Sequence, residues 1–283
     1  MIRPCFSTLA CPDWTFEEVA AFAVQHGYAG VDARTAGTRG GDFTADPALT
    51  SGDKLKTLFR DAAISLACVS SSLTLDRPVF PPVVGRLLPS ATDDVREGRS
   101  LVDVAVETGA ELVRVYPFKL HGGRRRAGTL IRIAEQLYPI CDHTRHKSVK
   151  VVIENAGDFP LAGDLLQIMD LVGHPNLLAS YDASYAHSAG EDPVAGASLL
   201  GDKLALLRVK DADSNGQPVI LGQGLLNVRE TIRAASEASP DCWVSTTWER
   251  AWLPDLMSAE QAIANDAKTI YDSAGTNSSS SAA

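Results

Sequence analysis

Short β-rich runs alternate with amphipathic helical stretches along the whole chain, and this alternation limits the fold more than any other feature. The pattern is typical of βαβ units, in which helices join parallel strands and cover the sheet. No linker divides the alternating region. The predicted strands are CFSTLA (5–10), GVDAR (30–34), ISLACVSS (64–71), LVRVYPF (112–118), VKVVIEN (149–155), LLASYDA (177–183), LALLRVKD (204–211) and CWVSTTWE (242–249).

Between these strands, apolar residues recur at helical spacing, which predicts helices that pack one face against a core. The first helix begins at a capping-box pattern, Thr15 with Glu18, and ends near Gly27. Ser258 and Gln261 form a similar pattern before a final helix. The remaining stripes are Leu55, Leu58, Phe59 and Ala62; Leu101, Val102, Ala105 and Val106; Leu165, Ile168, Met169 and Val172; and Val228, Thr231, Ile232 and Ala235.

Eight strand and helix repeats in a chain of 283 residues predict an α/β fold, a single (β/α)8 TIM barrel over residues 1–274. The low-complexity tail GTNSSSSAA (275–283) is predicted to be disordered. An open doubly wound sheet is the alternative. Its nucleotide-binding form carries a glycine fingerprint after the first strand, and LACPDW (9–14) has none. The sequence contains no Walker A loop, GxSxG elbow or HExxH motif.

Charge and composition narrow the class of partner. A net charge of −9 and a pI near 5.1 argue against nucleic acid or an anionic membrane, so we expect a small soluble molecule. The five cysteines have neither metal-ligand nor disulfide-framework spacing, which favours reduced, buried thiols. The N-terminus lacks the apolar core of a signal peptide, and no segment reaches membrane-spanning length. We therefore expect a cytoplasmic protein.

Polar side chains gather where the predicted strands end, which is where barrels carry their functional groups. Glu154 directly follows a run of apolar β-branched residues, and a buried carboxylate is costly unless it is paired or bound to a cation. Strand alternation places Arg208 and Lys210 on one face of their predicted strand, and Thr247 and Glu249 on one face of theirs, so each pair can line the same cavity. The other polar residues at strand ends are Asp32, Arg34, Arg114, Tyr116, Asn155, Asp182 and Asp211.

Several motifs resemble, in this order, the xylose-isomerase-like barrel family, also called the sugar phosphate isomerase/epimerase family. They are IENAGDF (153–159), the DASY of SYDASYAH (180–187), RVKDAD (208–213), LGQG (221–224) and VSTTWE (244–249). The resemblance covers nearly the whole chain. It implies a divalent metal bound by a Glu on strand 5, an Asp on strand 6, a His on strand 7 and a Glu on strand 8, with two glutamates exchanging a proton with a sugar carbon. Glu154 and Asp182 match the first two ligands.

The chain departs from the family pattern on three strands. Where the family has H-x-K-D on strand 7, this chain has Arg208 in the place of the histidine, and a guanidinium has no lone pair to give a metal. On strand 8, Thr247 replaces the first acid of S-L-E-W-E and only Glu249 remains. The family's strand-6 histidine, three places after the Asp, is Tyr185 here, with His187 two residues further on.

Two explanations for Glu154 stay open. In the first, Glu154, Asp182 and Glu249 hold Mg²⁺, Mn²⁺ or Zn²⁺, which would stabilise an enediolate. In the second, Arg208 takes the place of the metal, pairs with Glu154 and Asp182, and donates hydrogen bonds to a developing oxyanion. We favour the metal-free alternative for this sequence.

The resulting functional hypothesis is an isomerase or epimerase that removes a proton next to a carbonyl of a small carbohydrate or polyol derivative. Glu154 and Glu249 would act as acid–base residues, with Arg208 and Lys210 stabilising the oxyanion. A lyase or dehydratase on a similar substrate, or a barrel that only binds, are the alternatives. The resemblance also implies a homo-oligomer. The candidate substrate-binding residues are Arg34, Arg114, Asn155, His187 and Trp248, and the loop HGGRRR (121–126) is a weaker candidate for phosphate.

Overall fold

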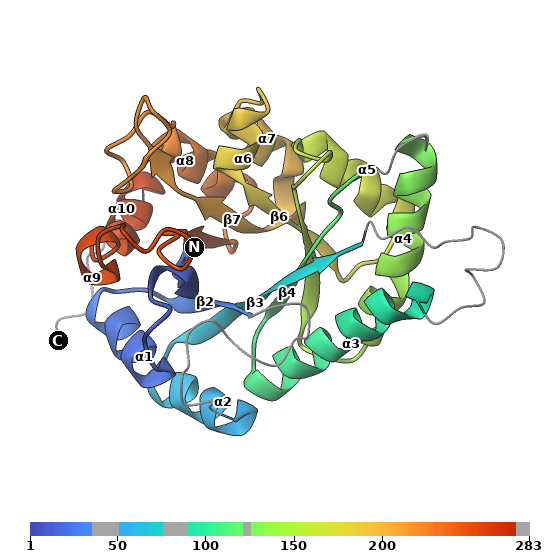
Figure 1. The fold of residues 1–283 in the computed structure, drawn as a ribbon, viewed down its shortest axis with the longest axis horizontal. Helices are drawn as coiled ribbons and strands as arrows, with labels where there is room; N and C mark the ends of the chain where they lie inside the picture. Colours follow the sequence, from blue (N-terminus) through green and yellow to red (C-terminus); the bar gives the residue numbers. More distant parts are fainter. Residues whose placement is uncertain (36–50, 76–89, 121–125, 276–283) are drawn as a thin grey trace.

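The computed structural model describes residues 1–35, 51–75, 90–120 and 126–275. Within them, eight parallel strands close into a barrel with the helices on the outside, in the order β1-β10-β7-β6-β5-β4-β3-β2 (Figure 1). The predicted (β/α)8 fold is thus confirmed. The barrel strands are β1 (Arg3–Ser7), β2 (Gly30–Arg34), β3 (Ser65–Thr74), β4 (Leu112–Tyr116), β5 (Lys150–Glu154), β6 (Leu177–Asp182), β7 (Leu204–Val209) and β10 (Trp243–Thr246).

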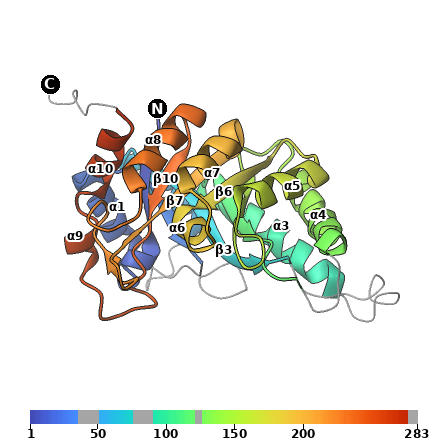
Figure 2. The ribbon, with the colours of Figure 1, turned by 90° about the horizontal axis from the view of Figure 1, so that it is seen from above.

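Helices follow the strands and cover the barrel; α6 and α7, for example, contact β7 from outside (Figure 2). The predicted capping box of α1 is confirmed, because Thr15 accepts from the Glu18 amide and Glu18 accepts from the Thr15 amide. The helices are α1 (Phe16–Gln25), α2 (Gly52–Asp61), α3 (Ser90–Thr108), α4 (Arg126–His143), α5 (Ala162–Val172), α6 (Ala183–Ser188), α7 (Pro193–Leu200), α8 (Val228–Ala238), α9 (Ala259–Ala262) and α10 (Asp266–Ser273). None of these described helices has the length and apolar character that a membrane crossing needs.

Several element boundaries differ from the sequence prediction. The first strand stops at Ser7, and residues 8–10 form the 3-10 helix η1 (Thr8–Ala10). The prediction for β7 is too long, because the chain leaves the barrel after Val209 and forms the antiparallel hairpin β8 (Asp211–Ala212) with β9 (Pro218–Val219). Ser258 makes no side-chain cap bond, so the second capping box is wrong. A second 3-10 helix, η3 (Gly201–Lys203), precedes β7.

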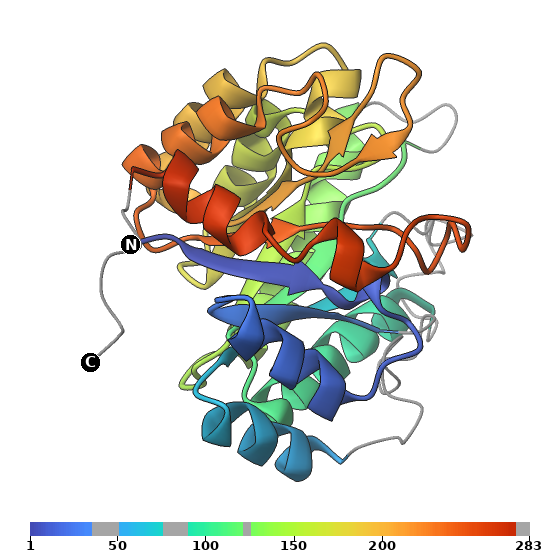
Figure 3. The same ribbon diagram turned by 90° about the vertical axis from the view of Figure 1, so that its left-hand side faces the viewer.

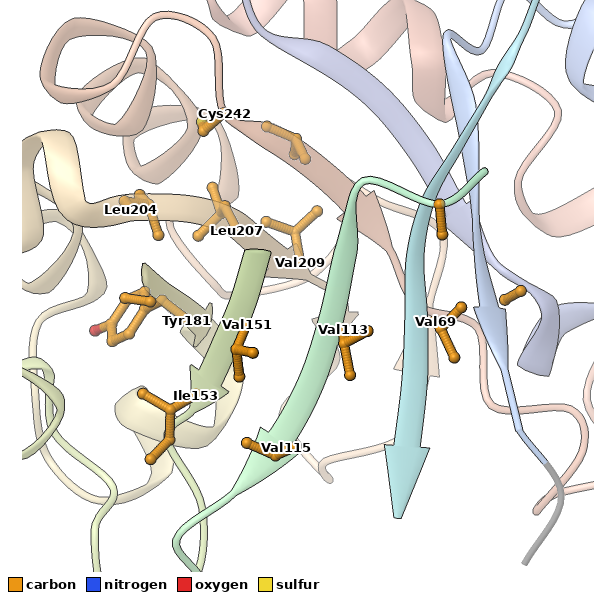
Figure 4. Packing of buried hydrophobic residues seen from close by; sticks show 14 of the residues in the cluster. Val69, Val113, Val115, Val151, Ile153, Tyr181, Leu204, Leu207, Val209 and Cys242 are labelled. Atoms are coloured by element: carbon orange, nitrogen blue, oxygen red, sulfur yellow. The ribbon is translucent and has the colours of Figure 1, made fainter. Parts of the chain in front are cut away.

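The two faces of the barrel strands bury different side chains. On β4 and β5, Val113, Val115, Val151 and Ile153 belong to the large hydrophobic core between strands and helices (Figure 4). The opposite faces fill the barrel interior with a separate apolar cluster, so the barrel is a packed core and not a pore. This inner cluster consists of Cys5, Ala67, Cys68, Leu112, Val152, Leu206 and Trp243.

The loops at the C-terminal ends of the strands surround one end of the barrel. Strand β1 points toward the end at which the β8–β9 hairpin and the loop between β10 and α9 project (Figure 3). After β5, the chain turns at Gly157, whose φ is 59°. A side chain there would place its Cβ 1.9 Å from the carbonyl oxygen of Phe118, so only glycine fits. The close approach keeps the loops after β4 and β5 together. Residues 276–283 of the predicted tail lie outside the described residues.

Candidate active site

Two residues beyond the inner apolar cluster, the barrel interior changes from apolar to charged. Arg114, Glu154 and Arg208 each follow an inward apolar residue of the same strand by two positions, and each is at most 4% exposed. Asp32 on β2 is fully buried at the same level. Strand alternation therefore brings four ionised groups from four strands into one buried layer. Three buried hydroxyl groups complete it: Ser70, Ser180 and Ser245.

Glu154 lies between two guanidinium groups. The Nη1 atom of Arg114 is 3.3 and 3.2 Å from the two carboxylate oxygens, and Ser180 donates its hydroxyl hydrogen to Oε2 at 2.8 Å. The Nε atom of Arg208 lies 3.5 Å from the same Oε2 atom. Ion pairing therefore accounts for the burial of this carboxylate. Arg114, which was predicted to bind substrate, donates the direct hydrogen bonds to Glu154.

Arg208 makes its shortest ion pair with Asp32 and not with Asp182, which corrects the expected pairing. Its Nη1 atom lies 2.6 Å from Asp32 Oδ2, and its Nη2 atom lies 3.2 Å from the hydroxyl oxygen of Thr247. Ser70 and Ser245 also donate to the Asp32 carboxylate. Strands β2 and β7 are not neighbours in the barrel, so the pair spans its interior.

Asp182 instead caps the N-terminus of α6. Its Oδ1 atom accepts from the Tyr185 amide at 2.9 Å and from the Ser184 hydroxyl at 2.8 Å. The side chain of Asn155 binds the Asp182 backbone on both sides, since its Oδ1 accepts from the amide and its Nδ2 donates to the carbonyl. The same Nδ2 also donates to the carbonyl of Pro160. Asn155 therefore joins the ends of β5 and β6, and both of its donor hydrogens are used within the protein.

The buried ion pairs keep their members charged. Burial alone would raise the pKa of Glu154, but Arg114, Arg208 and Ser180 together hold it below its ordinary value. Burial lowers the pKa of Arg114, but Glu154, Tyr116 and Asp32 together outweigh this and leave it raised. The pKa of Arg208 is raised in the same way, because Glu154 and Asp32 outweigh its burial. Glu154 and its two guanidinium partners are therefore a fixed set of opposite charges at neutral pH.

A second charged pair lies closer to solvent. The Nζ atom of Lys210 is 3.1 Å from Oε1 of Glu249, and their side chains are 32% and 30% exposed. Lys210 follows Arg208 by two residues and Glu249 follows Thr247 by two, as the predicted alternation requires. Arg208, on β7, contacts Thr247, the first residue after β10. The segments that leave β7 and β10 therefore make two successive side-chain contacts, a buried one and a partly exposed one.

The other candidate residues have varied surroundings. Arg34 is 8% exposed and donates to the Ser71 carbonyl at 2.8 Å and to the Ser72 hydroxyl at 2.6 Å. His187 is exposed in the last turn of α6. Trp248 belongs to the hydrophobic core and its Nε1 donates to a backbone carbonyl, so we do not include it in the proposed site.

The arginine-rich loop is only partly described. Residues 121–125 of HGGRRR lie outside the described residues. Arg126 begins α4, forms an ion pair with Asp164, and places its guanidinium 4.8 Å from the ring centre of Phe159. These contacts give Arg126 a structural role between α4 and the loop after β5.

The described residues do not fit a divalent metal. Among them, no three His, Cys, Asp or Glu side chains come together as a metal-binding group. The donor set explains why: Glu154 is bound by Arg114, Asp182 caps a helix, and Glu249 contacts Lys210. A cation placed beside these carboxylates would have to displace positively charged side chains that already neutralise them.

The three serines of the buried layer were not predicted from the sequence. Each lies two residues after an inward apolar residue, so strand periodicity contained the signal: Ser70 after Cys68, Ser180 after Leu178 and Ser245 after Trp243. Their hydroxyl groups donate to Asp32 or Glu154, which makes them part of the charge layer. Asp32 was noticed as a strand-end residue but not assigned to the site.

A family model described as "Xylose isomerase-like TIM barrel" matches residues 20–272. The protein belongs to this family. The resemblance seen in the sequence motifs is thereby confirmed.

Curated relatives match part of the chain. Fructoselysine 3-epimerases of Shigella flexneri and Escherichia coli O157:H7 are each 25% identical over 148 residues, which are 49% of this chain and 54% of theirs. The chain therefore matches about half the length of these relatives.

Solved structures share the fold over nearly the full length. The IOLI protein, solved with a bound zinc atom, has a TM-score of 0.76 at 16% identity and covers 99% of this chain and 100% of its own. L-ribulose 3-epimerase has a TM-score of 0.76 at 13% identity, with coverages of 98% and 95%. The probable 3-DHS dehydratase of Bacillus anthracis has a TM-score of 0.74 at 15% identity, with coverages of 95% and 98%. Epimerases thus occur both among the curated relatives and among the solved structures.

Proposed function

We propose that the protein moves a proton at the carbon next to the carbonyl group of a small polyhydroxylated substrate, and so epimerises or isomerises it. The observation that carries this proposal is the arrangement of two charged levels at the C-terminal end of the barrel. Beyond a buried layer of guanidinium and carboxylate groups, a partly exposed Lys210–Glu249 pair joins the segments that follow β7 and β10. The epimerases found in both comparisons support the same class of reaction.

Glu249 is the acid–base residue of the proposal. Its side chain is partly exposed, so a bound substrate can reach it, and the Lys210 ammonium lies 3.1 Å from its carboxylate. Glu154 is less suited to this role, because Arg114 and Ser180 already bind both of its oxygens. We therefore assign Glu154 to holding the guanidinium groups in place, with proton transfer left to Glu249.

Positive side chains provide the electrostatic stabilisation. Removal of the proton creates an enolate, whose oxygen needs preorganised donors or charge. We assign this to Lys210 and Arg208 in place of a divalent metal. Arg208 is fixed by Asp32 and Thr247, so its guanidinium costs little further reorganisation during the reaction.

Elimination of water is the second candidate function. The Lys210 ammonium lies 3.1 Å from Glu249, so one group could take the proton from carbon while the other protonates a departing β-hydroxyl. A 3-DHS dehydratase among the structural neighbours has the same fold. The two reactions share the enolate and differ in whether a hydroxyl group leaves.

The test is exchange of the substrate's α-hydrogen with solvent. The protein is treated with EDTA, dialysed, and incubated with D-fructose, D-tagatose or D-psicose in D2O, and deuterium incorporation is followed by proton NMR. We expect exchange and formation of the C3 epimer without added metal. Glu249→Gln should lower the rate by about 10²- to 10⁴-fold. Glu237→Gln, exposed on α8, is the matched control and should exchange at the wild-type rate.

The other outcomes separate the alternatives. Exchange that EDTA abolishes and Mn²⁺ restores would refute the assignment of Arg208 and Lys210 in place of a metal. Loss of water, detected as a new conjugated carbonyl by its ultraviolet absorbance, would favour the dehydratase. No exchange and no elimination, with or without Mn²⁺, across these sugars would refute the enzyme proposal and favour a binding barrel.

A further inference from the structure

Tyr116 lies at the C-terminal end of β4, directly above the buried charge layer. Side chains alternate along this strand, so Leu112, Arg114 and Tyr116 share its inward face. Leu112 belongs to the inner apolar cluster, Arg114 belongs to the charge layer, and Tyr116 follows at the end of the strand. The guanidinium carbon of Arg114 lies 4.7 Å from the centre of the Tyr116 ring. Unlike Arg114, which is 1% exposed, Tyr116 is partly exposed. Its position thus borders both the buried charges and the open end of the barrel.

The phenol faces several charged groups at once. Arg34, Arg114 and Arg208 each interact electrostatically with Tyr116, and so does Glu154. Burial raises the pKa of Tyr116, while the three guanidinium groups act in the opposite direction and Glu154 adds to the rise. The phenol is therefore protonated at neutral pH, and the positive charges of Arg34, Arg114 and Arg208 would all stabilise its anion.

We propose that Tyr116 is a catalytic acid that donates its phenolic proton to the carbonyl oxygen of the substrate. Glu249 takes the proton from the α-carbon, the C–H electron pair forms the C=C bond, and the carbonyl π electrons accept the Tyr116 proton. The products of this half-reaction are a neutral enediol, a protonated Glu249 and a Tyr116 phenolate. In the second half the protonated Glu249 gives its proton to carbon, the C=C electron pair forms the new C–H bond, and the enediol returns its O–H proton to the phenolate. Both residues regain their starting states, so no oxidant, reductant or other reactant is consumed.

The inference rests on the proposed function and adds a residue to it. Neither the family motifs nor the metal-ligand pattern involves a tyrosine at the end of strand 4. A purely structural role would be met by the aromatic ring, which packs against Arg114 with or without a hydroxyl. The hydroxyl group is what the proposal requires, so the two roles separate in a variant that removes only the oxygen.

The experiment compares Tyr116→Phe with the wild type in the α-hydrogen exchange assay, using D-fructose and D-psicose as probes. We expect kcat to fall by at least about 100-fold with KM changed by less than about threefold, because a proton transfer is lost and binding is kept. The melting temperature should stay within about 2 °C of the wild type. Tyr138→Phe is the control, since Tyr138 is exposed on α4, one of the helices outside the barrel.

A fluorinated tyrosine at position 116 gives a readout that a structural role would not change. Its more acidic phenol should restore activity relative to Tyr116→Phe and move the alkaline limb of the pH–rate profile to lower pH. If the wild type exchanges hydrogen and Glu249→Gln does not, but Tyr116→Phe stays within threefold of the wild type, the Tyr116 assignment is wrong while the proposed function stands. If the wild type itself fails to exchange, the proposed function is refuted and the Tyr116 assignment with it.

Discussion

The replacement Glu154→Gln tests whether this carboxylate is a partner of guanidinium groups. In the wild type its side chain is 5% exposed and that of Arg114 is 2% exposed, so solvent screens their interaction little. After the replacement, Arg208 keeps Asp32, but Arg114 has no carboxylate partner among the described residues. Breaking a buried ion pair by removing one member costs about 3–5 kcal/mol, because the remaining charge stays desolvated.

This free energy is large enough to measure by melting and by urea denaturation in the presence of EDTA. For a chain of this size, about 2–4 °C of melting temperature correspond to 1 kcal/mol, so we expect a fall on the order of 10 °C. Glu249→Gln is the matched control on the other level of the site. Its ion pair with Lys210 is about one third exposed, so its loss should cost only about 0–1 kcal/mol.

The stability that Glu154 contributes should also depend on pH, in a direction that follows from its lowered pKa. Since the folded-state pKa of Glu154 is lowered, the carboxylate contributes stability above its unfolded pKa and loses that contribution as the pH falls. The difference in unfolding free energy between wild type and Glu154→Gln should therefore be largest near neutral pH and should shrink below about pH 4. If the variant is as stable as the wild type in EDTA, and Mn²⁺ raises the melting temperature of the wild type alone, Glu154 is a metal ligand and the ion-pair argument is wrong.

Two further predictions concern buried groups outside the site. Burial raises the pKa of Asp266 to about 6, although the Thr246 hydroxyl donates a hydrogen bond to its carboxylate. The folded protein should therefore lose stability as the pH rises from about 4 to about 6. Asp266→Asn should remove that slope and gain on the order of 2–3 kcal/mol at neutral pH, measured by urea denaturation; equal pH slopes for the two proteins would contradict this. All five cysteines are buried with raised pKa values, so a thiol reagent should label none of them in the native protein and all five in denaturant. Rapid labelling of native protein would show that the barrel opens.

Local periodicity made most of the fold predictable. The strand predicted over residues 30–34 coincides with β2, and the capping box of α1 forms as expected, because both depend on neighbouring residues in the chain. The same signal was present but overlooked in α4, where Leu130, Ile133, Leu137 and Ile140 recur at helical spacing around an internal proline. Strand ends were less predictable, since a strand ends where the chain leaves the barrel and not where its β-rich residues stop.

The sequence by itself determined which residue types lie at the strand ends and which inner faces they share, since alternation is a property of each strand alone. The tertiary structure decided which charges pair. Arg208 pairs with Asp32, which is 176 residues away in the chain. Glu154 lies closer to Arg114 than to Arg208. The sequence had instead predicted that Arg208 pairs with Glu154 and Asp182. The physical reason is that ion pairs depend on distances of a few ångströms, and barrel closure and strand register set those distances between residues far apart in the chain.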